Sequence, residues 1–563
     1  MVGYALHIVY RHDRSKVSLF LHACGAPKSA LALWGAGLWH GVRRLQNRLE
    51  TQVLGRDKIC AVVAAADSKM MLRQLRAALR QTRTIELRLD WLSGDREITR
   101  FLGRLRSIRP KATLVATCRR RGAGGKYAGT IASQLAHLVE AIGAGCEWYD
   151  LEIESVRQCP PGLLQIMLGE GRQLTSAHFF ERLPKNLPRV ASELARGRSD
   201  AIKIAAHCES LRAARKVFAI ASKRKNVVAI PMGDVALPAR LLAVREGSAF
   251  TYAPIENATA PGQVSLDDIK QVYRLDRLTR RTRVYGVVGN PVGHSLSPLM
   301  QNAGFAARRL DAIYLPFLVR DLRDFVDSIE PFDISGFSVT IPHKQRILDY
   351  LDRCDPLAEK IGAVNTVVRI GGQLCGYNTD YVGVLRSLES RMPLRGSRVL
   401  IVGAGGAARA VAFALAQSGA VPCVTARRPV RAQALAHAAG GQAIPRERLR
   451  SEFFDAIVNA TPVGMHPRTG ESPLESRELN CRLVFDTIYR PRMTKLLQLA
   501  KQRDIETVSG VEMFVAQGAA QFEIWTGQQA PVDAMRRAVL RTLTREEKAA
   551  GSGVAKRTSR AAR

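Results

Sequence analysis

The chain has 563 residues and a formal net charge of +34, with 46% hydrophobic and 24% charged residues. This length allows several domains that each bury a core, and the composition is ordinary for a globular protein. No apolar run approaches the roughly 20 residues that span a bilayer, and no convincing cleavage site follows the short apolar stretch at 31–39. We therefore expect neither a membrane protein nor a secreted one.

The ten cysteines form no CxxC pair and no Cys/His cluster with zinc spacing. This pattern predicts free thiols in a reducing cytoplasm and no bound metal. The positive charge would suit a nucleic-acid-binding protein, but Lys and Arg are spread along the chain among acids. No RNP motif, zinc finger or basic region joined to heptads is present. Nucleic-acid binding is kept only as an alternative, and we expect the charge to attract anionic substrates. The oligomeric state is left open.

Residues 1–56 show no clear hydrophobic period and are treated as an extension of unknown role. From residue 57 to 275, short apolar runs alternate with amphipathic segments, which is typical of βα units. There are eight such runs, so the sequence predicts a (β/α)8 barrel with its chemistry at the C-terminal ends of the strands. The runs begin at Ile59, Ile85, Ala112, Tyr149, Gln173, Asp200, Val227 and Ala249.

Two ionisable residues of this region suggest imine chemistry. Lys203 lies between apolar neighbours in the sixth run, where burial would lower its pKa and leave a nucleophilic amine. His178 ends the fifth run and would project into the same mouth as a proton carrier. Taken singly, Lys203 is also compatible with a structural ion pair and His178 with a satisfied core histidine.

Further polar residues fall at strand ends. Glu86 and Arg88 alternate along the second run, while Arg119, Arg240 and Gln263 follow the third, seventh and eighth. Several arginines at one mouth imply a carboxylate ligand, because the guanidinium fork matches a carboxylate.

Over roughly 58–275 the chain resembles type I 3-dehydroquinate dehydratase, in the pieces ELRLD, ATCR, DLE, the SxH strand end, KIA and APGQ. The resemblance implies that Lys203 forms a Schiff base and that His178 is the general acid/base. It implies that the substrate is bound by Glu86, Arg88, Arg119, Arg240, Thr259 and Gln263. The family's usual glutamate before the paired glycines of the third loop is replaced by Ala123, which puts the elimination rate in question.

A helix-like basic connector is predicted near 265–283, and a new domain opens at Val284. Ser295 and Ser297 are two residues apart and can bond one oxygen-rich group, although a turn with capping serines fits equally well. Lys344 and Asp380 could form a proton-transfer pair beside a carbinol oxygen. Taken alone, Lys344 or Asp380 would be interpreted as a surface charge.

A second composition break precedes the strand VLIV, which runs into GAGGAAR. A strand, a glycine turn and a helix bring backbone N–H groups to a pyrophosphate, so this segment predicts a Rossmann domain. The next strand is followed by Arg427, Arg428 and Arg431, where an NAD-binding fold carries an acid for the ribose. Arginines favour a 2′-phosphate, so NADP is the predicted cofactor.

Over roughly 284–543 the chain resembles shikimate dehydrogenase, through HSLSP, VTIPHK, GAVNT, NTD, GAGGAAR, NATPVGM and GVEMFVAQGAAQ in order. The resemblance implies that Lys344 transfers a proton with Asp380 as its partner. It implies that shikimate is held by Ser295, Ser297, Thr340, Asn365, Asp380, Tyr489 and Gln517. It places the cofactor on Gly403, Ala404, Gly405, Gly406, Ala407, Ala426, Arg427, Arg428, Arg431, Thr487 and Gly510. Ala426-Arg427-Arg428 departs from the family's Asn-Arg-Thr.

Together the two halves resemble the dehydratase–dehydrogenase fusion of the shikimate pathway. The implied α/β architecture is a barrel over 57–275, a substrate domain over 284–382 and 511–543, and a Rossmann domain over 383–510, followed by a basic, disordered tail over 544–563. The rival enzyme is a quinate dehydrogenase with an impaired barrel. The presence of both Ser295 and Ser297 favours shikimate over quinate as the substrate.

Overall fold

The computed structural model describes residues 54–55, 57–159, 164, 171–196, 199–256 and 263–561, with side chains described as far as 548. The predicted N-terminal extension, apart from residues 54–55, and Thr259 lie outside these ranges. None of the described helices is long and apolar enough to cross a membrane.

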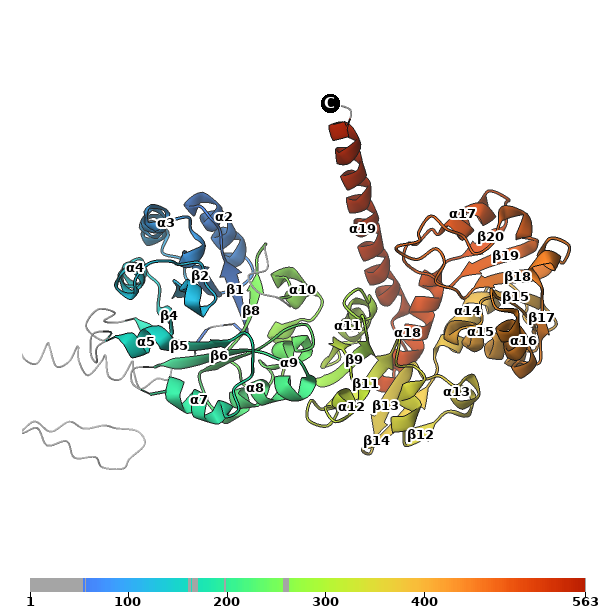
Figure 1. The fold of residues 1–563 in the computed structure, drawn as a ribbon, viewed down its shortest axis with the longest axis horizontal. Helices are drawn as coiled ribbons and strands as arrows, with labels where there is room; N and C mark the ends of the chain where they lie inside the picture. Colours follow the sequence, from blue (N-terminus) through green and yellow to red (C-terminus); the bar gives the residue numbers. More distant parts are fainter. Residues whose placement is uncertain are drawn as a thin grey trace, which may run out of the picture. The chain divides into compact units, whose positions relative to one another are not determined.

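Among the described residues, the first sheet has eight strands in the order β7-β6-β5-β4-β3-β2-β1-β8, and neighbouring strands in this order are parallel. Each of the eight predicted runs contains one strand, so the predicted (β/α)8 architecture is confirmed (Figure 1). The strands are β1 (Ile59–Val63), β2 (Thr84–Arg88), β3 (Thr113–Thr117), β4 (Trp148–Glu152), β5 (Arg172–Phe179), β6 (Ala201–His207), β7 (Val227–Met232) and β8 (Thr251–Pro254).

The sheet closes on itself between β7 and β8 through the segment that precedes β8. The Ala249 N–H donates to the Val227 carbonyl at 2.8 Å. Ser248 Oγ accepts from the Ala229 N–H at 3.1 Å and donates to the Phe250 carbonyl at 3.1 Å. One buried serine thus carries hydrogen bonds that a regular ladder would otherwise supply, and it joins the last two strands of the barrel.

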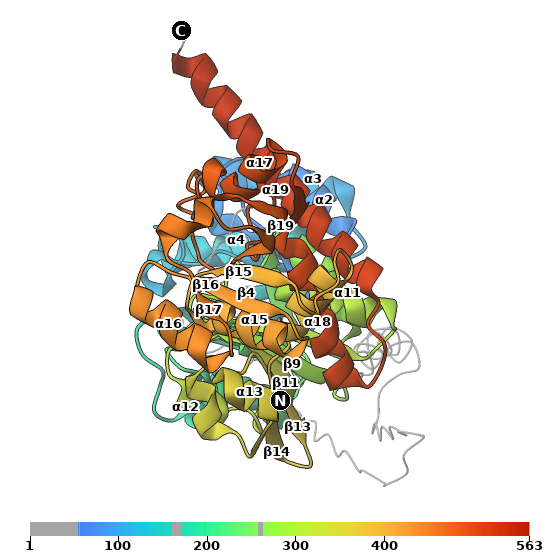
Figure 2. The same ribbon diagram turned by 90° about the vertical axis from the view of Figure 1, so that its right-hand side faces the viewer.

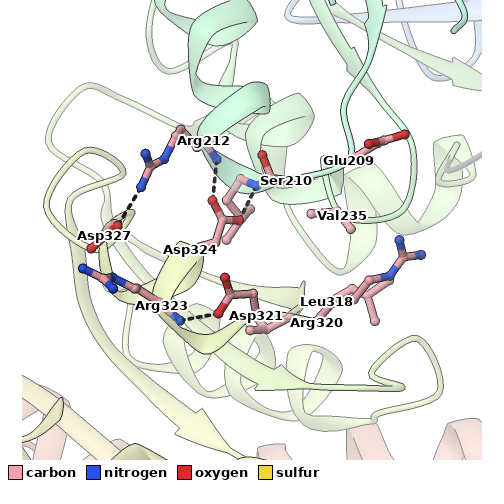
Figure 3. A pocket seen from close by; sticks show the side chains of 12 residues that line it. Glu209, Ser210, Arg212, Val235, Leu318, Arg320, Asp321, Arg323, Asp324 and Asp327 are labelled. Carbon is pink, nitrogen blue, oxygen red and sulfur yellow. Dashed lines mark hydrogen bonds and ion pairs between the residues drawn. The ribbon is translucent and has the colours of Figure 1, made fainter. Parts of the chain in front are cut away.

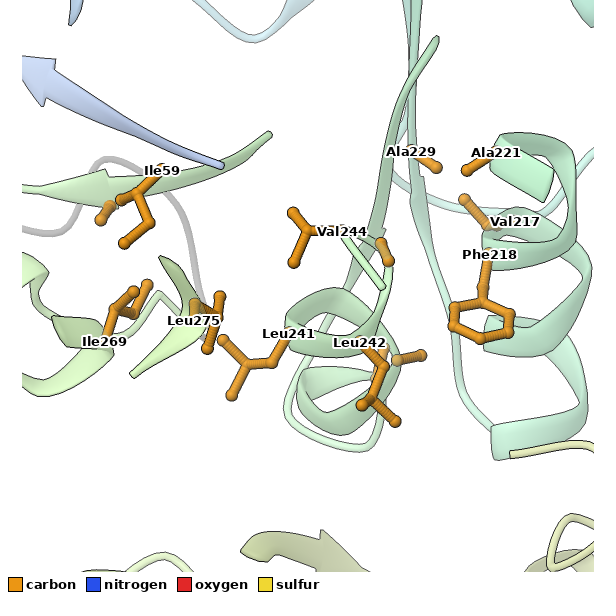
Figure 4. Close-up of a cluster of buried hydrophobic side chains, with 14 of the residues drawn as sticks. Ile59, Val217, Phe218, Ala221, Ala229, Leu241, Leu242, Val244, Ile269 and Leu275 are labelled. Atoms are coloured by element: carbon orange, nitrogen blue, oxygen red, sulfur yellow. The ribbon is translucent and has the colours of Figure 1, made fainter. Parts of the chain in front are cut away.

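Amphipathic helices cover the outside of this sheet. In α8, Val217, Phe218 and Ala221 are buried, and Ala229 of β7 lies opposite Ala221 in the same apolar cluster (Figure 4). Side-chain caps start several helices, as where Ser210 accepts from the Ala213 N–H. The helices are α2 (Ser68–Leu79), α3 (Asp95–Ile108), α4 (Ile131–Gly143), α5 (Ile153–Gln158), α7 (Leu187–Leu194), α8 (Leu211–Lys223), α9 (Leu237–Leu242) and α10 (Leu266–Gln271).

The connector after the barrel is only partly helical. Helix α10 ends at Gln271, and a short 3-10 turn follows at Leu275–Arg277. Arg274 has φ 51°, in the left-handed region, which an α-helix cannot include. The prediction of a helix-like connector over the whole of 265–283 is therefore wrong after residue 271.

The second sheet is mixed, in the order β10-β9-β11-β13-β14-β12. Strand β13 runs antiparallel to both β11 and β14, and the other neighbouring strands of this sheet are parallel. Its strands are β9 (Arg283–Gly289), β10 (Ala312–Leu318), β11 (Ile334–Val339), β12 (Arg353–Cys354), β13 (Thr366–Ile370) and β14 (Gln373–Tyr377). The helices here are α11 (Ser297–Ala307), α12 (Leu322–Val326) and α13 (Pro356–Ile361).

The third sheet is wholly parallel, in the order β17-β16-β15-β18-β19-β20. Numbered from β15, this is the order 3-2-1-4-5-6 of a dinucleotide-binding fold, as the glycine turn predicted. Its strands are β15 (Arg398–Val402), β16 (Val421–Thr425), β17 (Gln442–Ala443), β18 (Phe454–Asn459), β19 (Cys481–Asp486) and β20 (Glu506–Val508). Its helices are α14 (Asp380–Glu389), α15 (Gly406–Gln417), α16 (Pro429–Ala438) and α17 (Lys495–Lys501).

The last two helices return to the second sheet. In α18 (Gly510–Thr526), Trp525 donates from its indole N–H to the Val367 carbonyl at 3.0 Å. Helix α19 (Val532–Ala561) is continuous through the basic end of the chain (Figures 1 and 2). The predicted disorder of the tail is therefore wrong for 544–561, a stretch rich in Ala, Glu, Lys and Arg, which favour helix.

Charged contacts join the barrel to the second sheet. Asp324 accepts from the backbone N–H groups of Leu211 and Arg212 at the start of α8, at 2.7 and 3.1 Å. A carboxylate from one enzyme half thus caps a helix of the other, where the helix dipole favours negative charge. Arg212 also pairs with Asp327 at 2.7 Å. These groups line a cavity of about 270 Å³ (Figure 3).

Candidate active sites

Lys203 lies in the middle of β6 and is buried. Its Nζ donates to Asp150 Oδ2 at 2.7 Å and to the Tyr252 hydroxyl at 3.1 Å, and it lies 3.5 Å from Glu86 Oε1. The three partners come from β4, β8 and β2, so the parallel barrel gathers them around one amine. Glu86, which the resemblance assigned to substrate binding, thus lies beside Lys203 inside the barrel.

Asp150 is the centre of this cluster, and the sequence reasoning missed it as a site residue. It accepts from Arg119 Nη2 at 2.6 Å and from Ser176 Oγ at 2.6 Å, in addition to Lys203. Burial alone would raise the pKa of Asp150, but the charges of Arg119 and Lys203 outweigh burial and hold it far below its usual value. The available signal was alternation, because Asp150 and Glu152 point to one face of β4.

His178 lies near the end of β5, in contact with Arg119. Arg119 Nη1 faces His178 Nε2, and because a guanidinium only donates, Nε2 accepts and the ring is neutral. Burial first, and then the charges of Arg119 and Lys203, lower the pKa of His178 well below its usual value. Nδ1 has no hydrogen-bond partner among the described residues. The geometry therefore holds a neutral imidazole beside the lysine cluster.

The predicted substrate arginines differ in how far the protein already neutralises them. Arg88 makes two bonds of 2.8 Å to the carboxylate of Asp90. Arg240, in α9, is buried, and among the described residues its guanidinium makes one hydrogen bond, from Nη2 to the Tyr252 carbonyl at 3.3 Å. Burial lowers the pKa of Arg240 to about 10. A guanidinium buried with so little compensation is the strongest candidate for an anionic ligand.

The loop that carries Ala123 lies against the His178 side of the site. Phe180 stacks on His178 with ring centroids 6.0 Å apart. A Cβ on Gly124 would come within 2.3 Å of the Phe180 ring, and one on Gly125 within 2.0 Å of the Arg119 carbonyl. The paired glycines are therefore sterically required, while Ala123 occupies a 3-10 turn with room at its surface. Gln263 lies between β8 and α10.

The two residues of the predicted proton-transfer pair lie together in the second half of the chain. Lys344 Nζ and Asp380 Oδ2 are 2.6 Å apart, and their side chains are 29% and 13% exposed. Asn365 Nδ2 donates to the other oxygen, Asp380 Oδ1, at 2.8 Å. The carboxylate is thus fixed at both oxygens while the ammonium keeps access to a ligand.

The predicted sugar-acid residues lie on several elements. Ser297 begins α11 and is buried, and its backbone N–H donates to Ser295 Oγ at 3.2 Å. Thr340 follows β11, and its methyl group would be 2.4 Å from a Cβ on Gly289, so this glycine permits the close approach. Gln517 donates to the Phe514 carbonyl at 2.9 Å.

The loop after β19 carries the other predicted contacts. Tyr489 stacks on Phe514 with ring centroids 4.4 Å apart, and burial raises its pKa. Thr487 Oγ1 donates to the Asn459 carbonyl at 2.8 Å. A Cβ on Gly510 would lie 2.4 Å from the Ile488 carbonyl carbon, so only glycine fits where α18 begins beneath this loop.

The residues of the glycine turn fit a dinucleotide. Gly403 has φ +121°, which a side chain would strain, and its N–H donates to the Thr425 carbonyl at 2.8 Å. A Cβ on Gly405 or Gly406 would meet nothing within 4 Å, so open space lies over the start of α15 where a pyrophosphate would approach. Ala404 and Ala407 complete this turn.

The arginines after β16 lie where the ribose of a bound dinucleotide is expected. Arg427, Arg428 and Arg431 are all exposed, and none of them forms an ion pair with another described residue. Ala426 is half-buried just before them. Three cations and no acid in this stretch fit a 2′-phosphate better than a 2′-hydroxyl.

Three family models match the chain. They are type I 3-dehydroquinase over residues 59–280, the shikimate dehydrogenase substrate-binding domain over 287–367, and the shikimate 5′-dehydrogenase C-terminal domain over 510–540. The chloroplastic bifunctional 3-dehydroquinate dehydratase/shikimate dehydrogenase of Arabidopsis thaliana is 33% identical over 501 residues, covering 84% of this chain and 82% of the relative. The chain belongs to this bifunctional family. The resemblance predicted from the motifs is confirmed.

Relatives of the second half alone also match. Shikimate dehydrogenase (NADP(+)) of Bacillus cereus is 45% identical over 273 residues, which is 46% of this chain and 99% of the relative. The structure of a Thermus thermophilus shikimate dehydrogenase in complex with NADP(H) and shikimate is 37% identical, with a TM-score of 0.44, and covers 46% of this chain and 99% of that one.

Proposed function

We propose that this member of the bifunctional family dehydrates 3-dehydroquinate to 3-dehydroshikimate in its barrel and reduces that product to shikimate in its second half, with NADP as the cofactor. The observation that carries the first reaction is the buried Lys203 held against Asp150 beside a neutral His178. The Lys344–Asp380 pair beside a dinucleotide fold carries the second. The two reactions are consecutive steps of the shikimate pathway.

In the barrel, the Lys203 ammonium condenses with the ketone and water leaves, which forms a protonated imine that keeps the positive charge on Nζ. The imine acidifies the adjacent C–H, and His178 takes that proton because its ring is neutral in this site. The neighbouring hydroxyl group leaves as water after protonation, and a second water hydrolyses the imine and frees Lys203. The net change is loss of one water. Asp150 fixes the position of Nζ, and Arg240 is placed to bind the substrate carboxylate.

In the second half, Lys344 donates a proton to the carbonyl oxygen of 3-dehydroshikimate as that oxygen becomes a hydroxyl. Asp380 holds Nζ in place, and Asn365 holds Asp380. NADPH, when bound, supplies the hydride that reduces the carbonyl carbon. Ser295 and Ser297 lie close together in the loop that starts α11, where they would orient the carboxylate end of the sugar acid.

A coupled assay tests both reactions in one chain. Addition of 3-dehydroquinate to the protein with NADPH should oxidise NADPH and yield shikimate. Borohydride added with 3-dehydroquinate should leave a reduced adduct on Lys203, detectable by mass spectrometry of its peptide. An unmodified Lys203 in a chain that still dehydrates the substrate would contradict the imine. A cytoplasmic location stays a proposal that rests on the cysteine pattern of the sequence.

A further inference from the structure

A chain of buried hydrogen bonds crosses the core of the substrate domain. The Tyr314 hydroxyl of β10 lies 2.5 Å from Ser338 Oγ of β11. Ser338 Oγ donates to Gln521 Oε1 of α18 at 2.8 Å. Gln521 Nε2 donates to the Asn365 carbonyl at 3.1 Å and to Thr366 Oγ1 at 3.0 Å. Tyr314, Ser338 and Gln521 are 0%, 6% and 2% exposed, so this chain is closed to solvent.

The direction of each bond is determined by the amide of Gln521. Its Nε2 faces a backbone carbonyl, so its Oε1 must face Ser338 and accept. Ser338 has one hydroxyl hydrogen, which goes to Gln521, and therefore it accepts from Tyr314. At the other end, Thr366 receives an N–H from Gln521 and donates its own hydrogen to Asn365 Oδ1 at 2.7 Å.

This direction decides how Asn365 faces the proton-transfer pair. Because Asn365 Oδ1 also accepts from the Thr379 N–H at 2.7 Å, its Nδ2 is turned toward Asp380 Oδ1. Asp380 in turn holds Lys344. The chain therefore ends at the pair assigned to proton transfer.

The opposite end of the hydrogen-bond chain is the Tyr314 phenol. Its hydrogen is committed to Ser338, and burial raises the pKa of Tyr314 above its usual range. The Tyr314 hydroxyl therefore stays protonated and remains a donor, which keeps the bond directions along the chain unchanged.

We propose that Tyr314, Ser338 and Gln521 are positioning residues that hold Asn365, and through it the Asp380–Lys344 pair, in one orientation. The inference rests on the proposed shikimate dehydrogenase activity of this site and extends it to three residues that need not touch the substrate. A satisfied buried network admits few alternative arrangements, because any reversed bond leaves a buried donor or acceptor unpaired. The proton-transfer pair is thus held in one arrangement.

The chain offers a matched control for the phenol. Tyr285 of β9 is also buried, and its ring packs on Trp525 at 5.5 Å between centroids, as that of Tyr314 does at 5.7 Å. Its hydroxyl, however, donates to the Trp525 carbonyl at 3.3 Å and lies outside the network. Tyr314→Phe and Tyr285→Phe therefore remove the same atom from the same core.

Tyr314→Phe should lower kcat/KM for shikimate about fivefold or more relative to Tyr285→Phe, since a buried hydrogen bond contributes about 1 kcal/mol. The KM for NADP and the dehydratase activity of the same chain should stay at wild-type values. Ser338→Ala should lower kcat/KM similarly, and the double variant should be no worse than the poorer single variant because the chain is already broken.

Three results would overturn the inference. Tyr314→Phe could match Tyr285→Phe, the effects of Tyr314→Phe and Ser338→Ala could multiply in the double variant, or the KM for NADP could rise as much as that for shikimate. A wild-type chain that does not oxidise shikimate with NADP would instead overturn the proposed function together with this inference. Equal melting temperatures of the two Tyr→Phe variants would show that both are folded to the same extent, so that their kcat/KM values can be compared directly.

Discussion

The two candidate active sites differ in whether their charged groups are buried or keep access to solvent. In the barrel, Lys203, Asp150 and Arg119 are at most 6% exposed and form one buried cluster of alternating charge. In the dehydrogenase, Lys344 and Asp380 keep 29% and 13% of their side chains exposed, and the buried groups behind them are neutral hydroxyls and amides. Charges removed from water must be paired, whereas neutral donors and acceptors need only complete their hydrogen bonds.

The contrast extends to titration. Asp150, beside two cations, has its pKa held far below the usual value although burial opposes this shift. Asp486, at the end of β19, accepts only from neutral groups, which are Thr494 Oγ1, Asn459 Nδ2 and the Ile488 N–H. Burial raises the pKa of Asp486 to about 6. Two buried aspartates at strand ends therefore shift in opposite directions, because only one of them has a charged partner.

The sharpest test of the comparison separates the two activities. Lys203→Met should lower dehydratase kcat by at least about a thousandfold, because it removes the nucleophile. Shikimate oxidation by the same chain should be unchanged. Asp150 keeps Arg119 as a charged partner in this variant, so the barrel should remain folded. Full dehydratase activity in Lys203→Met would refute the imine mechanism.

The reciprocal change lies in the second half. Lys344→Met should lower kcat for shikimate oxidation by roughly 10²–10⁴, the usual contribution of general acid–base catalysis. Dehydratase activity serves as the internal control. If KM for shikimate rises while kcat stays constant, Lys344 binds the substrate and does not transfer a proton.

A smaller effect is expected on cofactor choice. Arg427→Ala should lower kcat/KM with NADP by about tenfold and leave the value with NAD nearly unchanged, because charge-assisted bonds to a phosphate contribute roughly 1.5–3 kcal/mol before screening. The control is Arg395→Ala, which removes the same charge from an exposed residue before the amino end of β15, whereas Arg427 follows the carboxyl end of β16. Equal losses with both cofactors would show that Arg427 does not read the 2′-phosphate.

Acidification should lower the contribution of His178 to the stability of the barrel and raise the contribution of Asp486 to the stability of the Rossmann domain. His178 has a lowered pKa, so below pH of about 6.5 the unfolded chain binds a proton that the folded barrel does not, and stability falls. Asp486 has its pKa raised to about 6, so the folded state binds the proton first and gains stability between pH of about 6 and 4. Between pH 6.5 and 5.5, the wild type should lose about 1 kcal/mol more than His178→Asn in denaturant unfolding. Over the same pH range, the free energy of unfolding of Asp486→Asn should fall by more than that of the wild type, because the variant lacks the stabilising protonation of Asp486.

The smallest change concerns the loop of the barrel. Ala123→Glu should leave dehydratase kcat unchanged or raise it by up to about fivefold, the size of one weakly screened charge interaction. Ala123→Gln has nearly the same shape without the charge and is the control. Loss of activity in a folded Ala123→Glu chain would contradict the placement of this loop beside His178.

Much of the fold followed from local patterns. Eight apolar runs predicted eight strands, and a glycine turn between a strand and a helix predicted the third sheet, because periodicity and turn chemistry depend on neighbours in sequence. The Lys344–Asp380 pair was also predictable, since its motifs resemble those of a known family. The connector and the C-terminal tail were predicted wrongly, where a left-handed Arg274 and a helical run of Ala, Glu, Lys and Arg decided the outcome.

The partners of the reactive groups depended on tertiary structure. Asp150 joins Lys203 to Arg119 across 53 and 31 positions in the chain, and Gln521 reaches Asn365 across 156. No local period connects residues so far apart, because parallel strands and a returning helix bring them together only after folding. The sequence by itself determined which residue types stand at the strand ends. Only the packed structure decided which buried charge has no counter-charge among the described residues, as at Arg240, and which hydrogen bonds run from a buried tyrosine to the proton-transfer pair.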